Sequence, residues 1–356
     1  MEDRNRRLGL SVKTIEKPTY KTDPSLLHRY NQQNLIFNRI THDPNWTGYL
    51  RTTEKVGLKK IKENQPGYTR VDYALSEASW TVHDAYTEAF SWIRQKKPLG
   101  PSLMGTKWYE EKYKVTNLGK MSSQLKKGAK LAGANLCGIT EININWVFAN
   151  ERYTLEPIEL PDVKYAVVIG IEMDKLGIAT SPCNPSAAAV GIGYSKMAFI
   201  AGILAEFIRN LGYTAIPSGN DTAFSIPLAV DAGLGEMGRN GLLITPEYGP
   251  RVRLCKIFTD LPLIPDNPID FGVIDFCKSC KKCCYACEAD AISADDEPSY
   301  IRACKSTSVG VKKWAVDGEK CYNYWCDNGN DCANCISVCP YNTGRIDATP
   351  EDFWAT

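Results

Sequence analysis

The sequence carries almost no net charge and no long apolar segment. Its 42 lysines and arginines are balanced by 41 aspartates and glutamates, so the formal net charge is +1. A near-neutral chain gives no indication of a nucleic-acid surface or a polybasic membrane patch, and no nucleic-acid partner is expected. No run of eighteen apolar residues occurs, which argues against a transmembrane helix. With 356 residues, 44% of them hydrophobic, the chain suffices for two or three globular domains.

A usable export signal is also missing. Arg6 and Arg7 lie near the N-terminus, but no apolar segment follows them. Secretory signals need such a segment. We therefore expect either a cytoplasmic protein or the mature part of an exported precursor.

Cysteine, in contrast, is abundant, and eight of the 14 cysteines form two spaced sets near the C-terminus. The spacings are C-x2-C-x2-C-x3-C and C-x2-C-x3-C-P, the second preceded by one more cysteine. Thiolates hold iron in tetrahedral sulfur coordination, and in two-cluster ferredoxins the fourth cysteine of a motif binds the other cluster. The sequence thus predicts two [4Fe-4S] clusters, one held by Cys277, Cys280, Cys283 and Cys339, the other by Cys321, Cys332, Cys335 and Cys287.

Two nearby cysteines compete as ligands, namely Cys284 and Cys326. Ten residues separate Cys321 from Cys332, whereas five separate Cys326 from Cys332, and the longer loop favours Cys321. Zinc sites would favour C-x2-C pairs, and a disulfide framework would favour a much shorter chain. Two clusters therefore explain the pattern best, and they make the protein a carrier of single electrons.

The remaining chain divides into two parts by pattern. Residues 1–120 are polar with few clear periods and are expected to form a wrapping unit, with helices over 51–62 and 84–94. Residues 121–270 predict an α/β domain, and residues 271–356 form the cluster module. In the α/β domain, 164–173 reads as a buried strand, Asn184 and Pro185 open an amphipathic helix that ends at Gly212, and 213–217 is a second strand. This order predicts a right-handed crossover, and 251–261 resumes strand-like alternation.

A glycine-rich stretch, DAGLGEMGRNGL, spans residues 231–242. It matches G-x-G-x-x-G, but no good strand precedes it and no acidic residue sits at a strand end about 20 positions on, so a dinucleotide site is weakly supported. Two interpretations stay open: a tight turn, or a set of free backbone amides that hold a ligand.

Taken together, residues 232–244, residues 253–261 and the two cysteine motifs resemble the corrinoid-dependent reductive dehalogenases. Epoxyqueuosine reductases, which modify tRNA, are similar but carry Gly-Trp-x-Gly-Lys-Asn-Thr where this chain has Gly-Glu-Met-Gly-Arg-Asn-Gly at 235–241. The resemblance implies an α/β (α+β) fold, with a central nitroreductase-like corrinoid-binding domain and a C-terminal ferredoxin-like module. It also implies a base-off cobalamin-type corrinoid, and no D-x-H-x-x-G motif is present to supply a histidine to cobalt.

The resemblance further implies the site residues. A tyrosine proton donor with a neighbouring asparagine and arginine maps onto Tyr194, Asn220 and Arg253, with Arg251 as the rival of Arg253. A guanidinium nearby stabilises a phenolate and could hold a departing halide. Periodicity alone makes Tyr194 a core residue, and Asn220 could be a turn residue. Trp314 and Trp325 are expected near the substrate or a cluster, and the candidate corrinoid contacts are Ser218, Gly219, Gly233, Gly235, Gly238 and Arg239.

The function implied is reductive dehalogenation of a small organohalide, with electrons from a low-potential donor. The family also implies a place on the outer face of the cytoplasmic membrane, a small membrane-anchor partner and a homodimer. Two alternatives stay open: an epoxyqueuosine-reductase-like enzyme acting on tRNA, and a non-catalytic iron–sulfur electron carrier.

Overall fold

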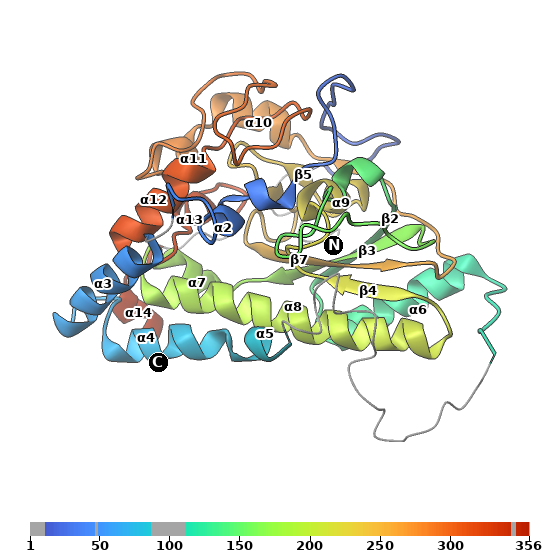
Figure 1. Cartoon of the computed structure of the whole chain (residues 1–356), viewed down its shortest axis with the longest axis horizontal. Helices are drawn as coiled ribbons and strands as arrows, with labels where there is room; N and C mark the ends of the chain where they lie inside the picture. The colour runs from blue at the N-terminus through green and yellow to red at the C-terminus, as the bar shows by residue number, and fades with distance from the viewer. Residues whose placement is uncertain (1–10, 47–48, 87–110, 343–346, 356) are drawn as a thin grey trace.

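A four-stranded sheet lies at the centre of the fold (Figure 1). The computed structural model describes residues 11–46, 49–86, 111–342 and 347–355. The strand order is β2-β3-β7-β4, and every neighbouring pair is antiparallel. These strands are β2 (Leu136–Glu141), β3 (Tyr165–Glu172), β7 (Val252–Thr259) and β4 (Ala215–Ser218). The predicted strands over 164–173, 213–217 and 251–261 are confirmed, with small shifts at their ends.

The predicted crossover from strand to helix to strand is present, but it spans one strand. β3 leads into α8 (Asn184–Asn210), which returns to β4. Because β3 and β4 both run antiparallel to β7, they are parallel to each other, with β7 between them. Strand β7 comes later in the chain, so the sequence order alone could not reveal its central place.

Both faces of the sheet are buried, which explains the nearly continuous apolar runs of its strands. Val167, Ile169 and Ile171 face one core together with α6 (Leu118–Leu131) and α8. Ala166 and Val168 face a second core with α9 (Ser225–Asp231) and the short helix Ile144–Trp146. Residues that alternate along one strand therefore enter two different cores.

Helix α8 is the long central helix of the molecule. Its first residue is Asn184, and its N-cap is Cys183, whose side chain makes no capping hydrogen bond. The Asn184 side chain accepts a hydrogen bond from Asn330 Nδ2 at 2.7 Å. The helix ends before Gly212, whose φ of 84° terminates it as predicted. It is apolar and long enough to cross a membrane by composition, but 67% of its most apolar window is buried inside the protein. The apolar side chains of α8 therefore pack in the core of the protein.

The described N-terminal residues wrap α8 and the cysteine-rich segment. Their helices are α2 (Ile36–Arg39), α3 (Tyr49–Lys62), α4 (Arg70–Ser79) and α5 (Thr81–Tyr86), plus a short turn at Gln32–Asn34. Helix α3 confirms the prediction for 51–62, whereas the rest of the predicted helix 84–94 lies outside the described residues. Helices α4 and α5 pack along α8, and α3 packs on α12 (Gly318–Asn328). The wrapping unit thus contacts both other parts of the chain.

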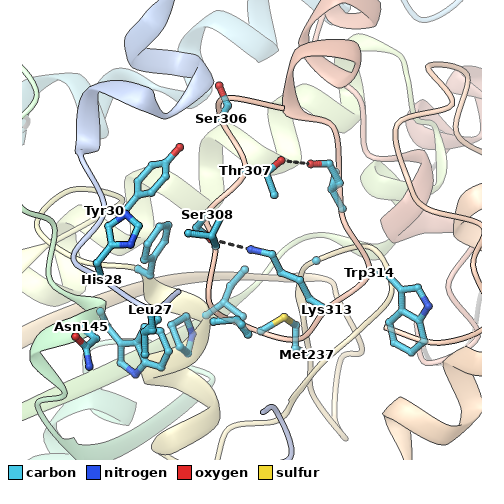
Figure 2. Close-up of a pocket in the computed structure, with 18 residues that line it drawn as sticks. Leu27, His28, Tyr30, Asn145, Met237, Ser306, Thr307, Ser308, Lys313 and Trp314 are labelled. Carbon is cyan, nitrogen blue, oxygen red and sulfur yellow. Dashed lines mark hydrogen bonds between the residues drawn. The ribbon is translucent and has the colours of Figure 1, made fainter. Parts of the chain in front are cut away.

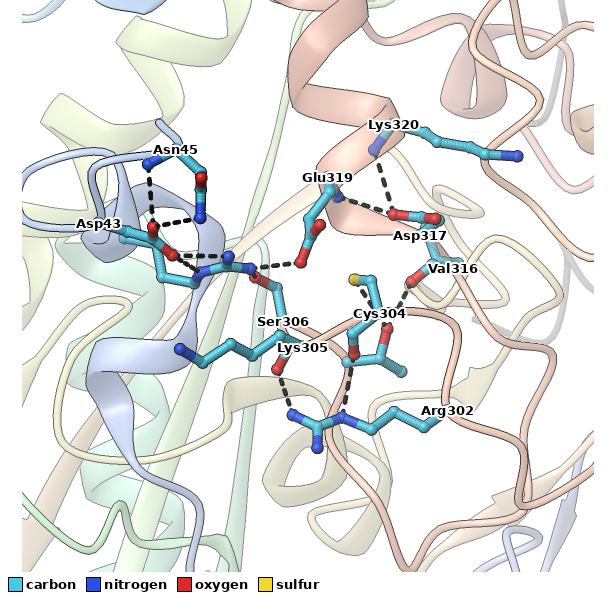
Figure 3. Close-up of polar contacts among 12 residues, drawn as sticks. Asp43, Asn45, Arg302, Cys304, Lys305, Ser306, Val316, Asp317, Glu319 and Lys320 are labelled. Atoms are coloured by element: carbon cyan, nitrogen blue, oxygen red, sulfur yellow. Dashed lines mark hydrogen bonds and ion pairs between the residues drawn. The ribbon is translucent and has the colours of Figure 1, made fainter. Parts of the chain in front are cut away.

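A buried arginine joins this wrapping unit to the C-terminal part, and its partners Asp43, Ser306 and Glu319 are labelled in Figure 3. Arg39 forms an ion pair with Asp43 at 2.7 Å and another with Glu319 of α12. It also donates to Ser306 Oγ at 3.2 Å. Nearby, Lys60 Nζ donates to the Asn328 carbonyl at 2.7 Å.

The C-terminal part consists of short helices connected by long loops. They are α10 (Val273–Ser279), α11 (Lys282–Tyr285), α12, α13 (Asn334–Ser337) and α14 (Pro350–Trp354). A two-stranded pair, β1 (Lys13–Thr14) with β8 (Ile269–Asp270), ties the beginning of the described chain to this part. The glycine-rich stretch forms a hairpin of β5 (Glu236–Met237) and β6 (Leu243–Ile244), and α7 (Lys175–Ala179) precedes α8.

Helix α6 offers a matched test of the core beneath the sheet. Leu125 is fully buried, whereas Leu131 on the same helix is 87% exposed. We expect Leu125→Ala to lower the free energy of unfolding by about 2–5 kcal/mol, because it leaves a cavity, and Leu131→Ala to change it by less than about 0.5 kcal/mol. Denaturation midpoints measured under anaerobic conditions would check this, and equal shifts for the two variants would contradict it.

Candidate functional site

The first predicted set of four cysteines comes together at α10, α11 and the end of α13. Cys277 lies on α10, Cys283 on α11, and Cys339 follows α13. Burial first, and then the neighbouring thiols of Cys277, Cys283 and Cys280, raise the pKa of Cys339 to about 12. Burial and then the Cys277 thiol likewise raise the pKa of Cys283 to about 12. These four thiols are therefore close neighbours in space.

The second predicted set comes together beside the first. Burial raises the pKa of Cys335 well above its ordinary value, and the neighbouring thiols of Cys321, Cys332 and Cys287 add to the shift. The Cys321 thiol in turn interacts with Cys332 and Cys287. Cys335 also interacts with Cys283 of the first set, so the two sets adjoin each other.

Cys326 lies apart from both sets. It is 1% exposed and packs in a small core with Ile36, Trp46 and Tyr322. The Cys284 thiol interacts with Cys287. It is not among the thiols that raise the pKa of Cys283, Cys335 or Cys339. The structure therefore favours Cys321 over Cys326 as a ligand.

The two sets provide the thiol donors that iron–sulfur cubanes use. Among the described residues, no three His, Cys, Asp or Glu side chains converge closely enough to hold one metal ion. The four cysteines of a cubane bind four different irons, so they surround a space the size of a cluster. Backbone amides of Ala291 and Asn334 also donate to the sulfurs of Cys287 and Cys332, both at 3.4 Å. Buried thiols resist ionisation, and a bound cluster would stabilise the thiolates.

Arg239 supports the first cysteine set from beneath. Its guanidinium is 1% exposed and donates to the carbonyl of Cys277 at 2.7 Å and to those of Ser293 and Asp295 at 2.8 and 2.7 Å. It also lies 4.6 Å from the ring centre of Trp314. These hydrogen bonds anchor the Arg239 guanidinium to the cysteine-rich segment.

The other candidate corrinoid contacts also have partners inside the protein. A Cβ atom at Gly233 or Gly235 would lie 2.4 or 2.1 Å from a backbone oxygen, so both positions require glycine for packing. Gly238 packs on Ile244, Gly219 N donates to Asp221 at 2.8 Å, and Ser218 Oγ lies 3.0 Å from Thr222 Oγ1. The turn interpretation explains the glycine-rich stretch, and corrinoid contact by these six residues stays a prediction.

The three predicted catalytic residues meet at one place on the central domain. Asn220 Nδ2 donates to the Tyr194 hydroxyl at 2.7 Å. The Arg253 guanidinium carbon lies 4.9 Å from the centre of the Tyr194 ring. They come from α8, from the loop after β4, and from β7, so only the folded sheet brings them together. Asn220 is exposed and Tyr194 partly so, which leaves the hydroxyl accessible.

Two glycines of α8 make this arrangement sterically possible. A Cβ at Gly193 would lie 2.8 Å from Arg253 Cγ, and a Cβ at Gly191 would lie 1.9 Å from Ser79 Oγ. Because these glycines have no side chain, Arg253 can pass over Tyr194, and Trp80 can stack on the Tyr194 ring with the two ring centres 4.7 Å apart. Sequence reasoning named Trp80 as an aromatic residue of a core or a cavity but did not place it beside Tyr194, although the repeated glycines before Tyr194 were a usable signal for close approach.

Arg253, and not Arg251, has a free donor. Arg251 is bonded to Glu172 at 2.7 Å and to Asn342 at 3.0 Å, so it has a structural role. Arg253 Nε is buried and has no hydrogen-bond partner among the described residues. The carboxylate of Asp331 lies near Arg253, and although burial raises its pKa to about 6, Arg253 opposes that shift. Arg253 therefore retains a donor for a bound ligand.

The loop that carries Asn220 is held by a buried lysine. Lys256 is fully buried, and its ammonium donates to the carbonyls of Gly219 at 2.5 Å, Asp221 at 2.8 Å and Ala223 at 2.8 Å. The amide of Phe148 donates to the intervening Thr222 carbonyl at 2.9 Å. Burial lowers the pKa of Lys256 to about 8, which still leaves it charged at neutral pH. Sequence reasoning missed this residue, because one lysine in an apolar strand gives no sign of its partners.

The two predicted tryptophans have different neighbours. Trp314 is buried under Arg239 and donates to the Asp295 carbonyl at 2.9 Å. Trp325 packs on Phe37 with ring centres 5.2 Å apart, and its Nε1 has no partner among the described residues. Trp314 thus lies beside the first cysteine set, whereas Trp325 faces the wrapping unit.

Curated relatives of this chain are reductive dehalogenases. It is 35% identical to a tetrachloroethene reductive dehalogenase of Desulfitobacterium hafniense over 83% of this chain and 66% of that protein. The enzyme of the same name from Sulfurospirillum multivorans is 32% identical over 90% of this chain and 74% of that protein. An epoxyqueuosine reductase of Listeria monocytogenes is 30% identical over only 44% of this chain. No family model matches the chain.

Solved structures agree with these relatives. A reductive dehalogenase whose structure suggests a mechanism for B12-dependent dehalogenation superposes with a TM-score of 0.72 and 26% identity, covering 95% of this chain and 44% of that one. The catabolic reductive dehalogenase NpRdhA gives 0.70 and 25%, covering 96% and 46%. The chain thus spans about two thirds of the first curated relatives and under half of these solved chains.

The cysteine assignment yields a paired test. Cys321→Ser should lose one cluster, whereas Cys326→Ser should keep both, because Cys326 lies in a separate apolar core. Iron and sulfide content of anaerobically reconstituted protein, together with electron paramagnetic resonance of the reduced clusters, would measure this. Full iron in Cys321→Ser together with loss in Cys326→Ser would reverse the ligand assignment.

Proposed function

The chain belongs to the reductive dehalogenase family, and on that premise we propose that it replaces a halogen of a small organohalide by hydrogen. The reaction consumes two electrons and one proton and releases one halide anion. The contact of Asn220 with the Tyr194 hydroxyl beneath Arg253 carries this proposal, because it combines a proton donor with a free cationic donor. The full activity, its substrate and its partners are all part of the proposal.

Two kinds of cofactor would serve this reaction. The eight cysteines would hold two [4Fe-4S] clusters, and the central domain would hold a base-off corrinoid. When bound, these groups would supply a strongly reducing cobalt centre fed with single electrons. The adjacent cysteine sets support this arrangement, because Cys335 of one set interacts with Cys283 of the other.

Tyr194 would deliver the proton to carbon. Its hydroxyl is accessible, and the amide N–H of Asn220 points at the oxygen that becomes negative when the proton leaves. A hydrogen bond to the charged form favours that form, and a guanidinium over the ring adds to the effect. The stacked Trp80 ring fixes the orientation of the phenol.

Arg253 would receive the halide. Its Nε donor is buried and unpaired, and a buried donor without an acceptor is unfavourable. A halide leaving carbon beside Tyr194 would satisfy this donor and neutralise part of the guanidinium charge.

The cellular setting follows from family membership as an expectation. We expect a low-potential electron donor, a small membrane-anchor protein and a location on the outer face of the cytoplasmic membrane. A homodimer is likewise expected. The tRNA-modifying alternative receives less support, because the epoxyqueuosine reductase matches less than half of the chain.

Removing one hydroxyl group tests the proton donor. Tyr194→Phe keeps the ring that stacks on Trp80, so iron content and corrinoid binding should be unchanged. Halide release should fall by roughly 10²–10⁴-fold, the range for loss of a general acid. Anaerobic halide-release assays over a panel of organohalides would measure it, and undiminished turnover by this variant would remove Tyr194 from the reaction.

Lys256 offers a test of how Asn220 is positioned. Asn220→Ala should slow halide release by about 10–100-fold, as expected for a hydrogen bond to a developing charge. Lys256→Met frees the loop and should slow the reaction through the same contact. The double variant should therefore be no slower than the worse single variant.

The matched control for that experiment is Ser225→Ala. It removes the longest Lys256 contact, at 3.2 Å, and a long 3.5 Å bond from Ser225 Oγ to the Gly219 carbonyl, and it leaves the three lysine–carbonyl contacts in place. We expect its rate to stay close to that of the unaltered chain. Strictly multiplicative effects of Lys256→Met and Asn220→Ala would show that the two residues act independently.

A further inference from the structure

One of the three histidines of the chain lies beside Tyr194. The His83 ring centre is 5.5 Å from that of Tyr194 and 5.3 Å from that of Trp80, at interplanar angles of 76° and 86°. Because Tyr194 and Trp80 are stacked, a ring nearly perpendicular to both lies along the edge of the stack. His28, in contrast, lines the cavity drawn in Figure 2, and His42 is exposed on the wrapping unit.

Two hydrogen bonds through Ser195 hold His83 against the helix that carries Tyr194. The backbone amide of His83 donates to Ser195 Oγ at 3.2 Å, and Ser195 Oγ donates to the Ser79 carbonyl at 2.6 Å. Ser195 lies on α8, Ser79 ends α4, and His83 lies on α5. The junction of α4 and α5 is therefore attached to α8 at the residue next to the predicted proton donor.

The imidazole of His83 also connects this place to solvent. Its Nδ1 lies 3.1 Å from Asp84 Oδ1. The His83 side chain is 28% exposed, and the Asp84 side chain is 73% exposed. An imidazole ring has two nitrogens that can each carry a proton, so it can release a proton at one side and accept one at the other. His83 thus has the stacked rings on one side and an exposed carboxylate on the other.

Each turnover of the proposed reaction leaves Tyr194 without its proton. The phenol O–H bond breaks as the C–H bond of the product forms, and a phenolate remains. The Asn220 amide donates a hydrogen bond to this oxygen but does not give up its proton, and the Arg253 guanidinium stays protonated in proteins. These two side chains therefore stabilise the phenolate, and neither of them can restore its proton.

We propose that His83 restores the proton of Tyr194 after each turnover, directly or through one water, and takes its own replacement from solvent beside Asp84. The imidazolium N–H bond breaks as the Tyr194 O–H bond forms, and the neutral imidazole then gains a proton from a hydronium ion or a buffer acid. An imidazolium is a stronger acid than a phenol, so the transfer to the phenolate runs downhill. This relay rests on the proposed function.

A comparison of the first turnover with later ones tests the relay. His83→Phe keeps a ring beside the stack and removes both nitrogens. Reduced holoenzyme with excess chemical reductant is mixed with an organohalide that the unaltered chain dehalogenates, and halide is measured by rapid quench. The first equivalent should be released at the unaltered rate, because Tyr194 begins with its proton. Later equivalents should be released roughly 10²-fold more slowly, the lower end of the range for loss of a proton-transfer group.

Chemical rescue separates proton transfer from packing. His83→Ala leaves room for a small heterocycle beside the stacked rings. Added imidazole should restore the later turnovers of this variant, whereas pyrazole, which has a similar shape but is a much weaker base, should not. The matched control is His42→Phe, which makes the same substitution at an exposed histidine of the wrapping unit and should leave all turnovers unchanged.

Three outcomes would overturn the relay alone. Equal slowing of the first and later turnovers in His83→Phe would show that His83 only positions the neighbouring rings. Unaltered later turnovers in that variant would show that Tyr194 regains its proton by another route. Equal rescue of His83→Ala by imidazole and pyrazole would show that the ring merely fills space. Failure of the unaltered chain to release halide from any organohalide would instead overturn the proposed function, and the relay with it.

Discussion

A buried ammonium group fixes the geometry on which the proposed chemistry depends. Lys256 lies fully inside the protein, and the carbonyls of Gly219, Asp221 and Ala223 compensate its charge. Because alternate carbonyls turn inward to the ammonium, the loop between them has little freedom. Asn220 is thereby held in contact with the Tyr194 hydroxyl. Burying a charge is costly without such dipoles, so the loop and the lysine stabilise each other.

Strand β7 connects this loop to the rest of the site. Arg253 and Lys256 lie three residues apart on β7, so their side chains leave opposite faces of the sheet. One passes over Tyr194 on the α8 side, and the other holds the loop after β4. Asp331, next to Cys332, lies near Arg253 and brings the cysteine-rich segment to the same strand. Strand β7 therefore joins the cysteine-rich part of the chain to the proposed catalytic residues.

Two of the buried cations, Lys256 and Arg239, are compensated by backbone oxygens, whereas Arg39 and Arg251 pair with carboxylates. Arg239 follows the same rule as Lys256, with its guanidinium bonded to carbonyls beneath the first cysteine set. Such cations keep their charge available to nearby groups, because no carboxylate neutralises them.

The sequence by itself determined the features that rest on local spacing. Cysteine intervals predicted which thiols group together, and apolar periodicity predicted the strands and the long helix, because ligand loops and periodic faces are short-range properties. The family resemblance selected Tyr194, Asn220 and Arg253. Only the tertiary structure decided the central position of β7, the structural role of Arg251, and the partners of Arg239 and Lys256. Those features depend on contacts between residues far apart in the chain, and a buried cation in a sequence gives no sign of which carbonyls or ligands will surround it.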